Sequence, residues 1–397
     1  MLCLRECTLL SWGQKSMNDR GSRQQSAQWL VRTATGLLSR GGNLQSGTPT
    51  VALDETTLRD ALRAHMEAEE SRQAAEEGRP PTQEVAVAAA DDVLREGRAA
   101  LERSAQGAAP TDLTDRETDA LQAIIQIVGR PALRYRDGHV QLPTNQVGEN
   151  EYWYVFIATA RTSIDRVSAA VARVAYGHSE EIAGTAWRLG PDLIVTNRHV
   201  AGYLVASKDA PRSQWKLDPS CVALADFAAT DGATKRTRFR ISALEYCANE
   251  DEVDIAVLRL ASQGESFPQP FCFESSPEPE LAAIGADVYV VGHPVSYDAS
   301  VTIERVFGKV DGKKRCSPGR ITALATSEPL LEHDCSTLGG NSGSCVLSRT
   351  SHRVLGVHSG SRGIDPATGV ALANRAVDLT RLGQHRLADI LTRGQVS

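Results

Sequence analysis

The charged segment between residues 53 and 104 carries two narrow apolar stripes. They recur first at four-residue and then at seven-residue steps, at Leu58, Leu62 and Met66, and at Val87, Leu94 and Leu101. Both spacings place apolar side chains on one face of an α-helix, and residues 78–81, Gly-Arg-Pro-Pro, mark a break between the stripes. We therefore expect two helices, which either pack on each other as a small helical domain or form a module that recognises a partner protein.

A further helix and a hairpin are predicted after this region. Thr114 and Glu117 have the spacing of a capping box, and an apolar helical pattern follows them up to Gly129. Beyond it, Asp137 and Gly138 form a dipeptide suited to the positive φ angles of a type I′ turn, with β-prone residues on both sides.

Short β-prone runs separated by turn residues dominate the rest of the chain. They lie at residues 171–176, 184–189, 193–196, 239–246, 255–260, 288–291, 345–347 and 354–357. This pattern favours an all-β sandwich or barrel over alternating β and α units. Residues 376–393 instead have leucines at helical spacing, so we expect a C-terminal helix that packs on the barrel.

The 397 residues exceed what one hydrophobic core usually organises, so two or more domains are expected. Residues 1–52 are expected to be a flexible N-terminus, 53–105 a helical region of unknown role, and 106–118 a linker and helix start. Met17 is an alternative start to Met1, and the sequence does not decide between them.

Composition narrows the function classes. A hydrophobic content of 41% and a charged content of 23% are typical of a soluble globular protein, and a formal net charge of −6 argues against nucleic acid as a partner. No apolar run approaches the roughly 20 residues that cross a bilayer, and the N-terminus lacks a signal-peptide pattern. We expect a cytoplasmic protein without membrane contact, whose dispersed cysteines are free thiols.

One serine lies within a run of small residues, Gly-Gly-Asn-Ser-Gly-Ser, at positions 339–344. A flexible backbone around Ser342 can direct N–H groups at a developing oxyanion. The run lacks the lysine of a phosphate-binding loop and leads into a β-prone segment, which excludes that function.

A serine nucleophile needs a base, and the base needs a third group that orients it. The sequence offers both groups. His199 ends the predicted strand in Val-Thr-Asn-Arg-His-Val, and Asp254 directly precedes the apolar run Ile-Ala-Val-Leu.

These segments, in the order Gly-Thr-Ala-Trp, Val-Thr-Asn-Arg-His-Val, Asp-Ile-Ala-Val-Leu and Gly-Gly-Asn-Ser-Gly-Ser, resemble the chymotrypsin-like (family S1) serine peptidases. The resemblance is to bacterial trypsin-like members above all, and to glutamyl endopeptidases. It covers about residues 170–378, with weaker support back to 119, and implies a chymotrypsin-like double β-barrel for a peptidase domain at 119–397. A small α-helical N-terminal region precedes this all-β catalytic domain.

The resemblance also implies roles for single residues. Ser342 is the nucleophile, His199 the general base and Asp254 its orienting carboxylate, while the backbone N–H groups of Gly340 and Ser342 form the oxyanion hole. It implies polypeptide substrates and no cofactor. Cys345 stands where the family commonly has proline, and a small apolar residue should be tolerated there.

Two segments, Ser-Thr-Leu-Gly-Gly and Gly-Val-His-Ser-Gly, resemble the lining of the primary substrate pocket in glutamyl endopeptidases. The resemblance implies that Thr337 and His358 contact an acidic side chain before the scissile bond. A hydroxyl and an imidazole suit a carboxylate better than a cationic side chain.

Three other hypotheses remain. Soft ligands cluster at His333, Cys335, Cys345, His352 and His358, but they lack paired zinc-binding spacings, so we expect no metal site. His293 is interpreted as a structural histidine at a turn. The alternative to an enzyme is a catalytically silent protease-fold binding or scaffold module, and the helical region is expected to regulate, target or bind a protein partner.

Overall fold

The computed structural model describes residues 31, 34–35, 55–108, 112–143, 150–234, 237–261, 264, 266–271, 279–295, 301–361, 374–382 and 389–390. The flexible N-terminus predicted for residues 1–52 lies almost entirely outside the described residues. Val31 and Ala34 are described, and both are buried against Ala100, Leu121 and Ile125.

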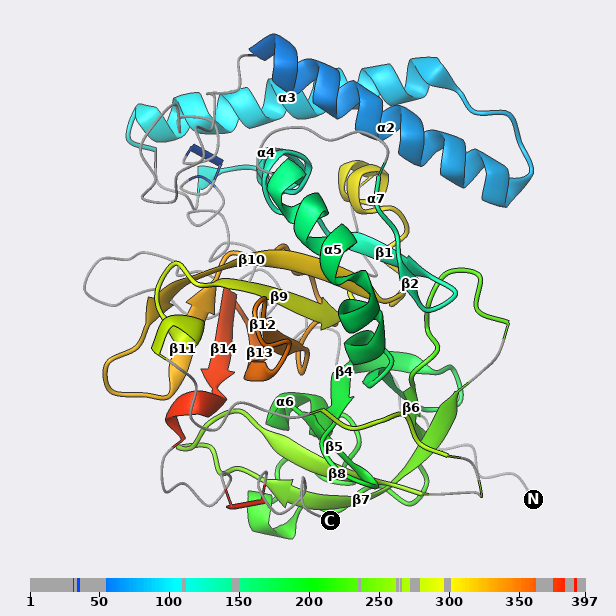
Figure 1. Ribbon diagram of the computed structural model, residues 1–397, viewed down its shortest axis with the longest axis vertical. Coiled ribbons are helices and arrows are strands. Elements are labelled where there is room, and N and C mark those ends of the chain that lie inside the picture. The colour runs from blue at the N-terminus through cyan, green and yellow to red at the C-terminus, as the bar shows by residue number, and fades with distance from the viewer. Residues whose placement is uncertain are drawn as a thin grey trace, which may run out of the picture.

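A layer of helices covers one end of the molecule, as Figure 1 shows. It consists of α2 (Glu55–Glu77), α3 (Gln83–Ala105), α4 (Asp115–Val128) and α7 (Val301–Phe307). The first predicted stripe, Leu58, Leu62 and Met66, lies in one buried cluster shared by all four helices. Of the second stripe only Leu94 lies in it, and the alanines of α3 with Val93 supply the rest of the α3 face. The prediction of two helices with a break between them is therefore confirmed.

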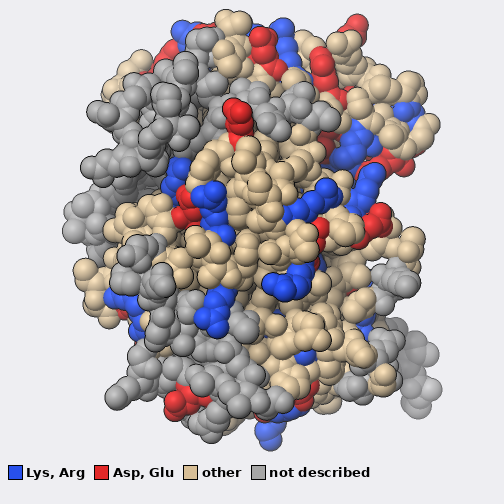
Figure 2. All heavy atoms as spheres, in the orientation of Figure 1, with Lys and Arg blue, Asp and Glu red and all other residues tan. Residues whose placement is uncertain are grey.

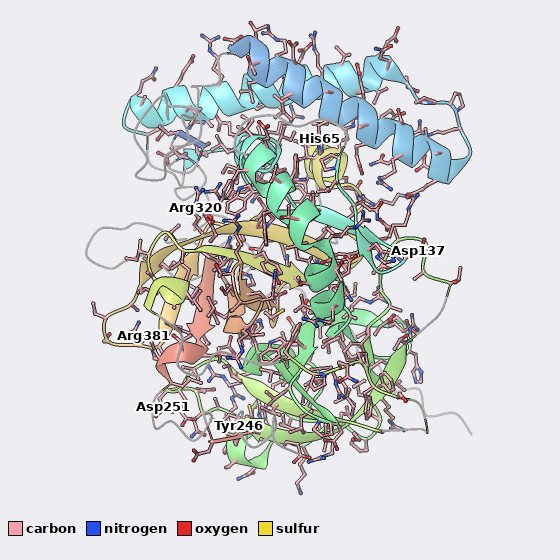
Figure 3. The ribbon with its side chains drawn as sticks, viewed as in Figure 1. His65, Asp137, Tyr246, Asp251, Arg320 and Arg381 are labelled. Carbon is pink, nitrogen blue, oxygen red and sulfur yellow. The ribbon has the colours of Figure 1, made fainter. Side chains whose placement is uncertain are left out.

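The predicted cap and hairpin are also present. Thr114 Oγ1 accepts a hydrogen bond from the Glu117 N–H, and the Glu117 carboxylate accepts one from the Thr114 N–H, which completes the capping box. Asp137 and Gly138 have φ angles of 50° and 82° at the turn between β1 (Leu133–Arg136) and β2 (His139–Val140). Figure 3 shows Asp137 at the tip of this hairpin.

Helix α5 (Asn150–Ser168) links the helical layer to the barrels and was not predicted. It runs beside the hairpin in Figure 1 and buries Trp153, Phe156, Ile157 and Ile164 in the largest core cluster. Its apolar residues are too closely spaced to form a single stripe, which is why the helix signal was missed.

The first barrel is a closed ring of six antiparallel strands in the order β3-β4-β5-β8-β7-β6. Apolar side chains of these strands, such as Ile194 and Leu258, fill its interior. The strands are β3 (Val171–Tyr176), β4 (Glu181–Arg188), β5 (Leu193–Thr196), β6 (Ala223–Asp226), β7 (Arg238–Cys247) and β8 (Ala256–Leu260).

The second barrel has the order β11-β14-β13-β12-β9-β10 and closes through pairing of β10 with β11. Strand β1 continues the sheet beyond β10, so the hairpin beneath the helical layer belongs to the same sheet. Together the two barrels confirm the predicted double β-barrel. The strands are β9 (Asp287–Gly292), β10 (Arg315–Leu324), β11 (Leu330–His333), β12 (Cys345–Ser348), β13 (Val354–Ser361) and β14 (Asn374–Asp378).

The start of the predicted C-terminal helix was wrong. Residues 376–378 belong to strand β14, and the 3-10 helix Leu379–Arg381 follows directly. Pairing of β14 with both β11 and β13 supplies backbone partners that local helix propensity does not anticipate. Asp389 and Ile390 are helical, and the remainder of the predicted segment beyond residue 382 lies outside the described residues.

Lys and Arg side chains alternate with Asp and Glu side chains on the face drawn in Figure 2. Such mixing agrees with the small net charge of −6. Among the helices of the described residues, none is long and apolar enough to cross a membrane.

Candidate active site

The structure brings His199 and Asp254 into direct contact. His199 lies in the short helix α6 (Arg198–Ala201) that follows β5, and Asp254 precedes β8, the neighbour of β5 in the first barrel. The His199 Nδ1 atom lies 2.6 Å from Asp254 Oδ2, and the His199 N–H donates to Asp254 Oδ1 at 3.1 Å. Asn197 Nδ2 adds a 2.8 Å hydrogen bond to the Asp254 carbonyl. One carboxylate therefore holds both the ring and the backbone of the histidine.

The Asp254 carboxyl is ionised over the neutral pH range. Burial raises its pKa, but the hydrogen bonds and the charge of His199 lower it more, so the net pKa lies below the ordinary value. An ionised acceptor at Nδ1 favours the tautomer with the proton on Nδ1. The Nε2 lone pair is then available to accept a proton.

Ser342 lies in the turn between β11 and β12, where the two barrels meet. The Ser342 carbonyl accepts a hydrogen bond from the Thr185 N–H of the first barrel at 2.8 Å, and the Gly343 N–H donates to the His358 carbonyl of the second at 2.8 Å. Gly343 has a φ angle of +90°, and a Cβ atom there would lie 1.9 Å from the Thr185 carbonyl oxygen. Only glycine therefore fits beside the serine.

His199 and Ser342 belong to opposite sides of this junction. Among the described residues, the hydrogen bond of the His199 ring goes to Asp254, and none joins the Ser342 hydroxyl to that ring. Catalytic hydrogen bonds often tighten only in the complex with substrate, so this arrangement is compatible with a nucleophile and base pair.

In the backbone around Gly340, the carbonyl groups accept hydrogen bonds, while the N–H groups predicted to form the oxyanion hole remain available to a ligand. Thr185 Oγ1 donates to the Gly340 carbonyl at 2.8 Å, and the Val295 N–H donates to the Gly339 carbonyl at 2.6 Å. Within the described residues, the N–H groups of Gly340 and Ser342 donate to no backbone carbonyl. Gly340 has a φ angle of +80°, which its lack of a side chain permits.

Of the two predicted pocket residues, His358 contacts the serine turn through the Gly343 N–H, and Thr337 lies five residues before Ser342 in the chain. His358 on β13 is buried, Thr337 is half-buried, and His358 Nδ1 lies 3.1 Å from Nε2 of His333 on β11. Burial lowers the pKa of His333 to about 3, and burial together with the neighbouring histidines His333 and His199 lowers that of His358 well below its ordinary value. Both rings are therefore neutral at pH 7. The pairing of His333 was missed, because only the sheet order, with β14 between β11 and β13, brings the two rings together.

No group of three metal-ligating side chains occurs in the part of the chain that the structure describes. Among the zinc candidates, His333 and His358 contact each other, and His352 Nδ1 lies 2.9 Å from the Tyr289 hydroxyl. Burial raises the pKa of the Cys345 thiol to about 12, so it stays protonated. His293 is buried with Nδ1 2.9 Å from the Gly312 carbonyl, as a structural histidine would be.

Residues 184–357 match the family of trypsin-like peptidase domains. The matched segment begins in β4, ends in β13 and contains His199, Asp254 and Ser342. This chain carries a trypsin-like serine peptidase domain. The trypsin-like peptidase is accordingly a hydrolase of the serine endopeptidase class.

Two solved structures are similar to this peptidase at a distance. The crystal structure of Deg5 has a TM-score of 0.39 and 16% sequence identity, over 59% of this chain and 94% of that chain. An inactive serine-to-alanine mutant of Rv3671c from M. tuberculosis H37Rv has a TM-score of 0.36 and 17% identity, over 57% and 90%. No curated protein matches the sequence significantly.

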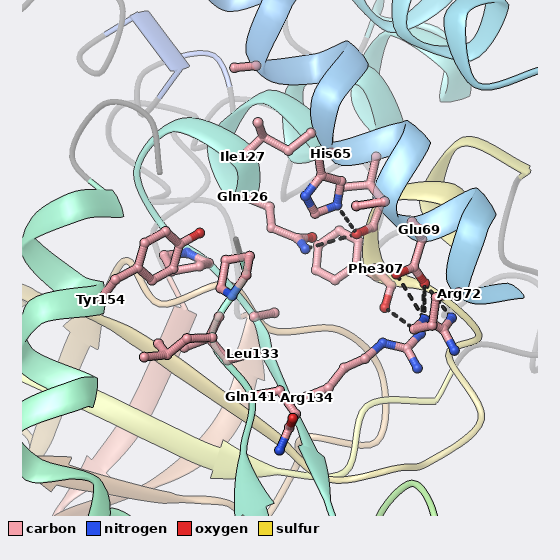
Figure 4. Close-up of a pocket in the computed structure, with 17 residues that line it drawn as sticks. His65, Glu69, Arg72, Gln126, Ile127, Leu133, Arg134, Gln141, Tyr154 and Phe307 are labelled. Atoms are coloured by element: carbon pink, nitrogen blue, oxygen red, sulfur yellow. Dashed lines mark hydrogen bonds and ion pairs between the residues drawn. The ribbon is translucent and has the colours of Figure 1, made fainter. Parts of the chain in front are cut away.

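A cavity of about 310 Å³ lies away from these residues, between the helical layer and the second barrel. Figure 4 shows its lining, with His65, Glu69, Gln126, Arg134 and Phe307. None of the predicted catalytic or pocket residues lines it.

Proposed function

We propose that this serine peptidase cleaves peptide bonds through an acyl-enzyme intermediate, with Ser342, His199 and Asp254 as its catalytic residues. The observation that carries the proposal is the double hydrogen bond between Asp254 and His199, within the segment that matches the peptidase family. It fixes the ring and leaves Nε2 as the base.

In the first half-reaction, the Ser342 Oγ attacks the carbonyl carbon of the scissile bond as His199 Nε2 takes the hydroxyl proton. The N–H groups of Gly340 and Ser342 stabilise the oxyanion of the tetrahedral intermediate. His199 then gives its proton to the leaving amine, the C–N bond breaks, and an ester to Ser342 remains. In the second half-reaction, water attacks the carbonyl carbon of this ester as His199 Nε2 takes its proton. The ester C–O bond then breaks, the proton passes to Ser342 Oγ, and the carboxylic acid leaves.

We further propose a preference for an acidic residue before the scissile bond. The support is the contact of His358 with the serine turn through the Gly343 N–H, the place of Thr337 five residues before Ser342, and the His333 ring 3.1 Å from the His358 ring. A bound carboxylate favours protonation of a neighbouring imidazole, so it would counteract the low pKa that burial imposes on His358.

Peptides that differ only in Glu, Lys or Leu before the scissile bond test this preference. We expect the Glu peptide to give the highest kcat/KM, and His358→Leu to lower kcat/KM for that peptide much more than for the Leu peptide. Preference of the wild-type protein for Lys or Leu would contradict it. A chain that hydrolyses no peptide, with Ser342→Ala identical to wild type, would instead support the silent binding module.

A further inference from the structure

We propose that the helical layer positions the oxyanion loop of this peptidase through Arg130, which acts as a positioning residue. The oxyanion loop is defined here as residues 334–342, from the end of β11 to Ser342. The catalytic meaning of the inference rests on the proposed function.

Arg130 directly follows α4 and holds the start of this loop from two sides. Its guanidinium Nη2 donates to Asp334 Oδ2 at 2.6 Å, with only 2% of the Arg130 side chain exposed. Its carbonyl accepts a hydrogen bond from the Ser336 hydroxyl at 2.6 Å. A buried charge is tolerated when it is paired, so movement of Asp334 away from Arg130 would separate two buried opposite charges at a cost.

Further hydrogen bonds hold Arg130, its neighbour Gly129 and Asp334 in place. Its N–H donates to the Ile125 carbonyl of α4 at 2.8 Å, and Trp153 Nε1 of α5 donates to the Gly129 carbonyl at 2.9 Å. Asp334 Oδ1 accepts from the Arg320 N–H of β10 at 2.6 Å. Arg130 therefore joins helices α4 and α5 to a loop whose far end carries Ser342.

A second contact lies farther along the same loop. Leu338 packs against the buried cluster of α2, α3, α4 and α7, and it precedes Gly339 and Gly340. The Val295 N–H, from the segment before α7, donates to the Gly339 carbonyl. Thr337, the predicted pocket residue, thus lies between two points that contact the helical layer.

Ion pairs and hydrogen bonds connect the layer to the strands below it. Around the cavity in Figure 4, Arg134 of β1 pairs with Glu69 of α2 at 3.0 Å and with Asp231 at 3.1 Å. His65 Nε2 of α2 lies 2.8 Å from the Val306 carbonyl of α7. Because β1 pairs with β10, the Arg134–Glu69 ion pair joins α2 to the sheet of the second barrel, and the layer can hold Arg130 in place.

Oxyanion donors act only when they are held in place before the reaction, and a displacement of about 1 Å can cost on the order of 10² in rate. Arg130 touches neither substrate nor the reacting atoms. Its effect is on the position of the Gly340 and Ser342 N–H groups.

The test uses the full chain with Arg130→Met, Asp334→Asn, and the double variant Arg130→Met with Asp334→Leu, which leaves no unpaired charge. The control is Arg238→Met, which removes ion pairs to Glu180 and Asp226 in the first barrel. For each protein, the rate of labelling by a fluorophosphonate, kcat and KM for a peptide, and hydrogen exchange of residues 334–343 are measured.

We expect all three loop variants, including the double variant, to react with the fluorophosphonate at least about tenfold more slowly. Their kcat should fall by a larger factor than their KM changes. Exchange in residues 334–343 should accelerate, while the control stays within about twofold of wild type. A double variant with wild-type labelling and exchange would overturn the inference, since the pair would then be merely structural.

Two further outcomes are informative. If the Arg130 variants do not fold, Ser336→Ala removes the hydrogen bond to the Arg130 carbonyl and keeps the ion pair, and it should change labelling and hydrogen exchange in the same direction; wild-type values for it would overturn the inference. If the wild-type chain is not labelled at all, the proposed function is wrong. Hydrogen exchange of residues 334–343 is then the only test of the inference. Faster exchange in the variants would support positioning of the loop by Arg130, and unchanged exchange would overturn it.

Discussion

Asp254 accepts hydrogen bonds from both the ring and the backbone of His199, so it sets the tautomer and the position of the ring together. An amide at this position can keep the shape of the contact, but it removes the charge that favours protonation of the ring during the reaction.

We therefore expect Asp254→Asn to lower kcat by about 10⁴-fold with little change in KM, in line with the same substitution in a serine peptidase triad. Steady-state kinetics on one peptide measures both constants. Asn197→Ala is the matched control, because it removes only the bond to the Asp254 backbone carbonyl. Equal losses in the two variants would contradict the role of the carboxylate.

The buried histidines predict how stability depends on pH. In the unfolded chain His333 takes up a proton as pH falls through about 6.5, whereas in the folded protein its pKa is about 3. The unfolded state therefore binds more protons between these values, and stability is lost as pH falls, by about 1.4 kcal/mol per pH unit for this residue.

We expect His333→Asn to reduce the loss of unfolding free energy between pH 6.5 and pH 5. Urea unfolding at both pH values measures it, in a Ser342→Ala background that avoids self-cleavage. Leu331→Ala, on the same strand, destabilises without removing a titrating group. A pH slope in His333→Asn equal to that of wild type would show that the burial of this ring is not what sets the dependence.

The sequence allowed single site residues to be predicted where each lies within its own local motif. Ser342 lies in a glycine-rich run, His199 follows a strand and Asp254 precedes one. The partners His333 and Arg130 were not predictable in this way. Arg130 and Asp334 are 204 residues apart, and only the packing of the helical layer on the second barrel brings them together.

At the scale of elements, hydrogen bonds from both barrels hold the serine turn. Thr185 of β4 contacts both the Ser342 and the Gly340 carbonyls, while His358 of β13 accepts from the Gly343 N–H. The turn is therefore held by one strand from each barrel, and Gly340 and Gly343 have positive φ angles.

We expect Gly343→Ala to reduce fluorophosphonate labelling at least 100-fold, because the new Cβ would lie 1.9 Å from the Thr185 carbonyl oxygen. Gly138→Ala is the control, since Gly138 also has a positive φ angle, of +82°, but a Cβ atom there would meet nothing within 4 Å. Comparable loss in both variants would trace the effect to backbone strain rather than to the contact with Thr185.

Helices and strands were predicted correctly where a single hydrophobic periodicity dominated the segment. The stripes of α2 and α3 and the runs that form β3 and β5 were predicted with bounds close to those observed. Strand β10 was missed because Pro318 and Gly319 interrupt it, and both disfavour strands locally. Its pairing with β9 overrides that preference, a tertiary effect that no local pattern contains.

For the whole molecule, the two barrels supply different parts of the candidate site. The first barrel provides His199 and Asp254, and the second provides Ser342 and the pocket residues Thr337 and His358. The helical layer contacts the second barrel, on the side of the oxyanion loop. The surface that this layer packs against was not predictable from helical stripes, which indicate packing but do not identify the partner surface.

The central claim is that Ser342 is a nucleophile activated by His199. A fluorophosphonate tests it most directly, because the attack of Oγ on phosphorus expels fluoride as the hydroxyl proton passes to the base. Peptide mass spectrometry of the labelled full chain should place one adduct on Ser342, with none in Ser342→Ala and labelling slowed at least about 10³-fold in His199→Ala. An adduct on a different residue, or equal labelling of the wild-type chain and His199→Ala, would contradict the account.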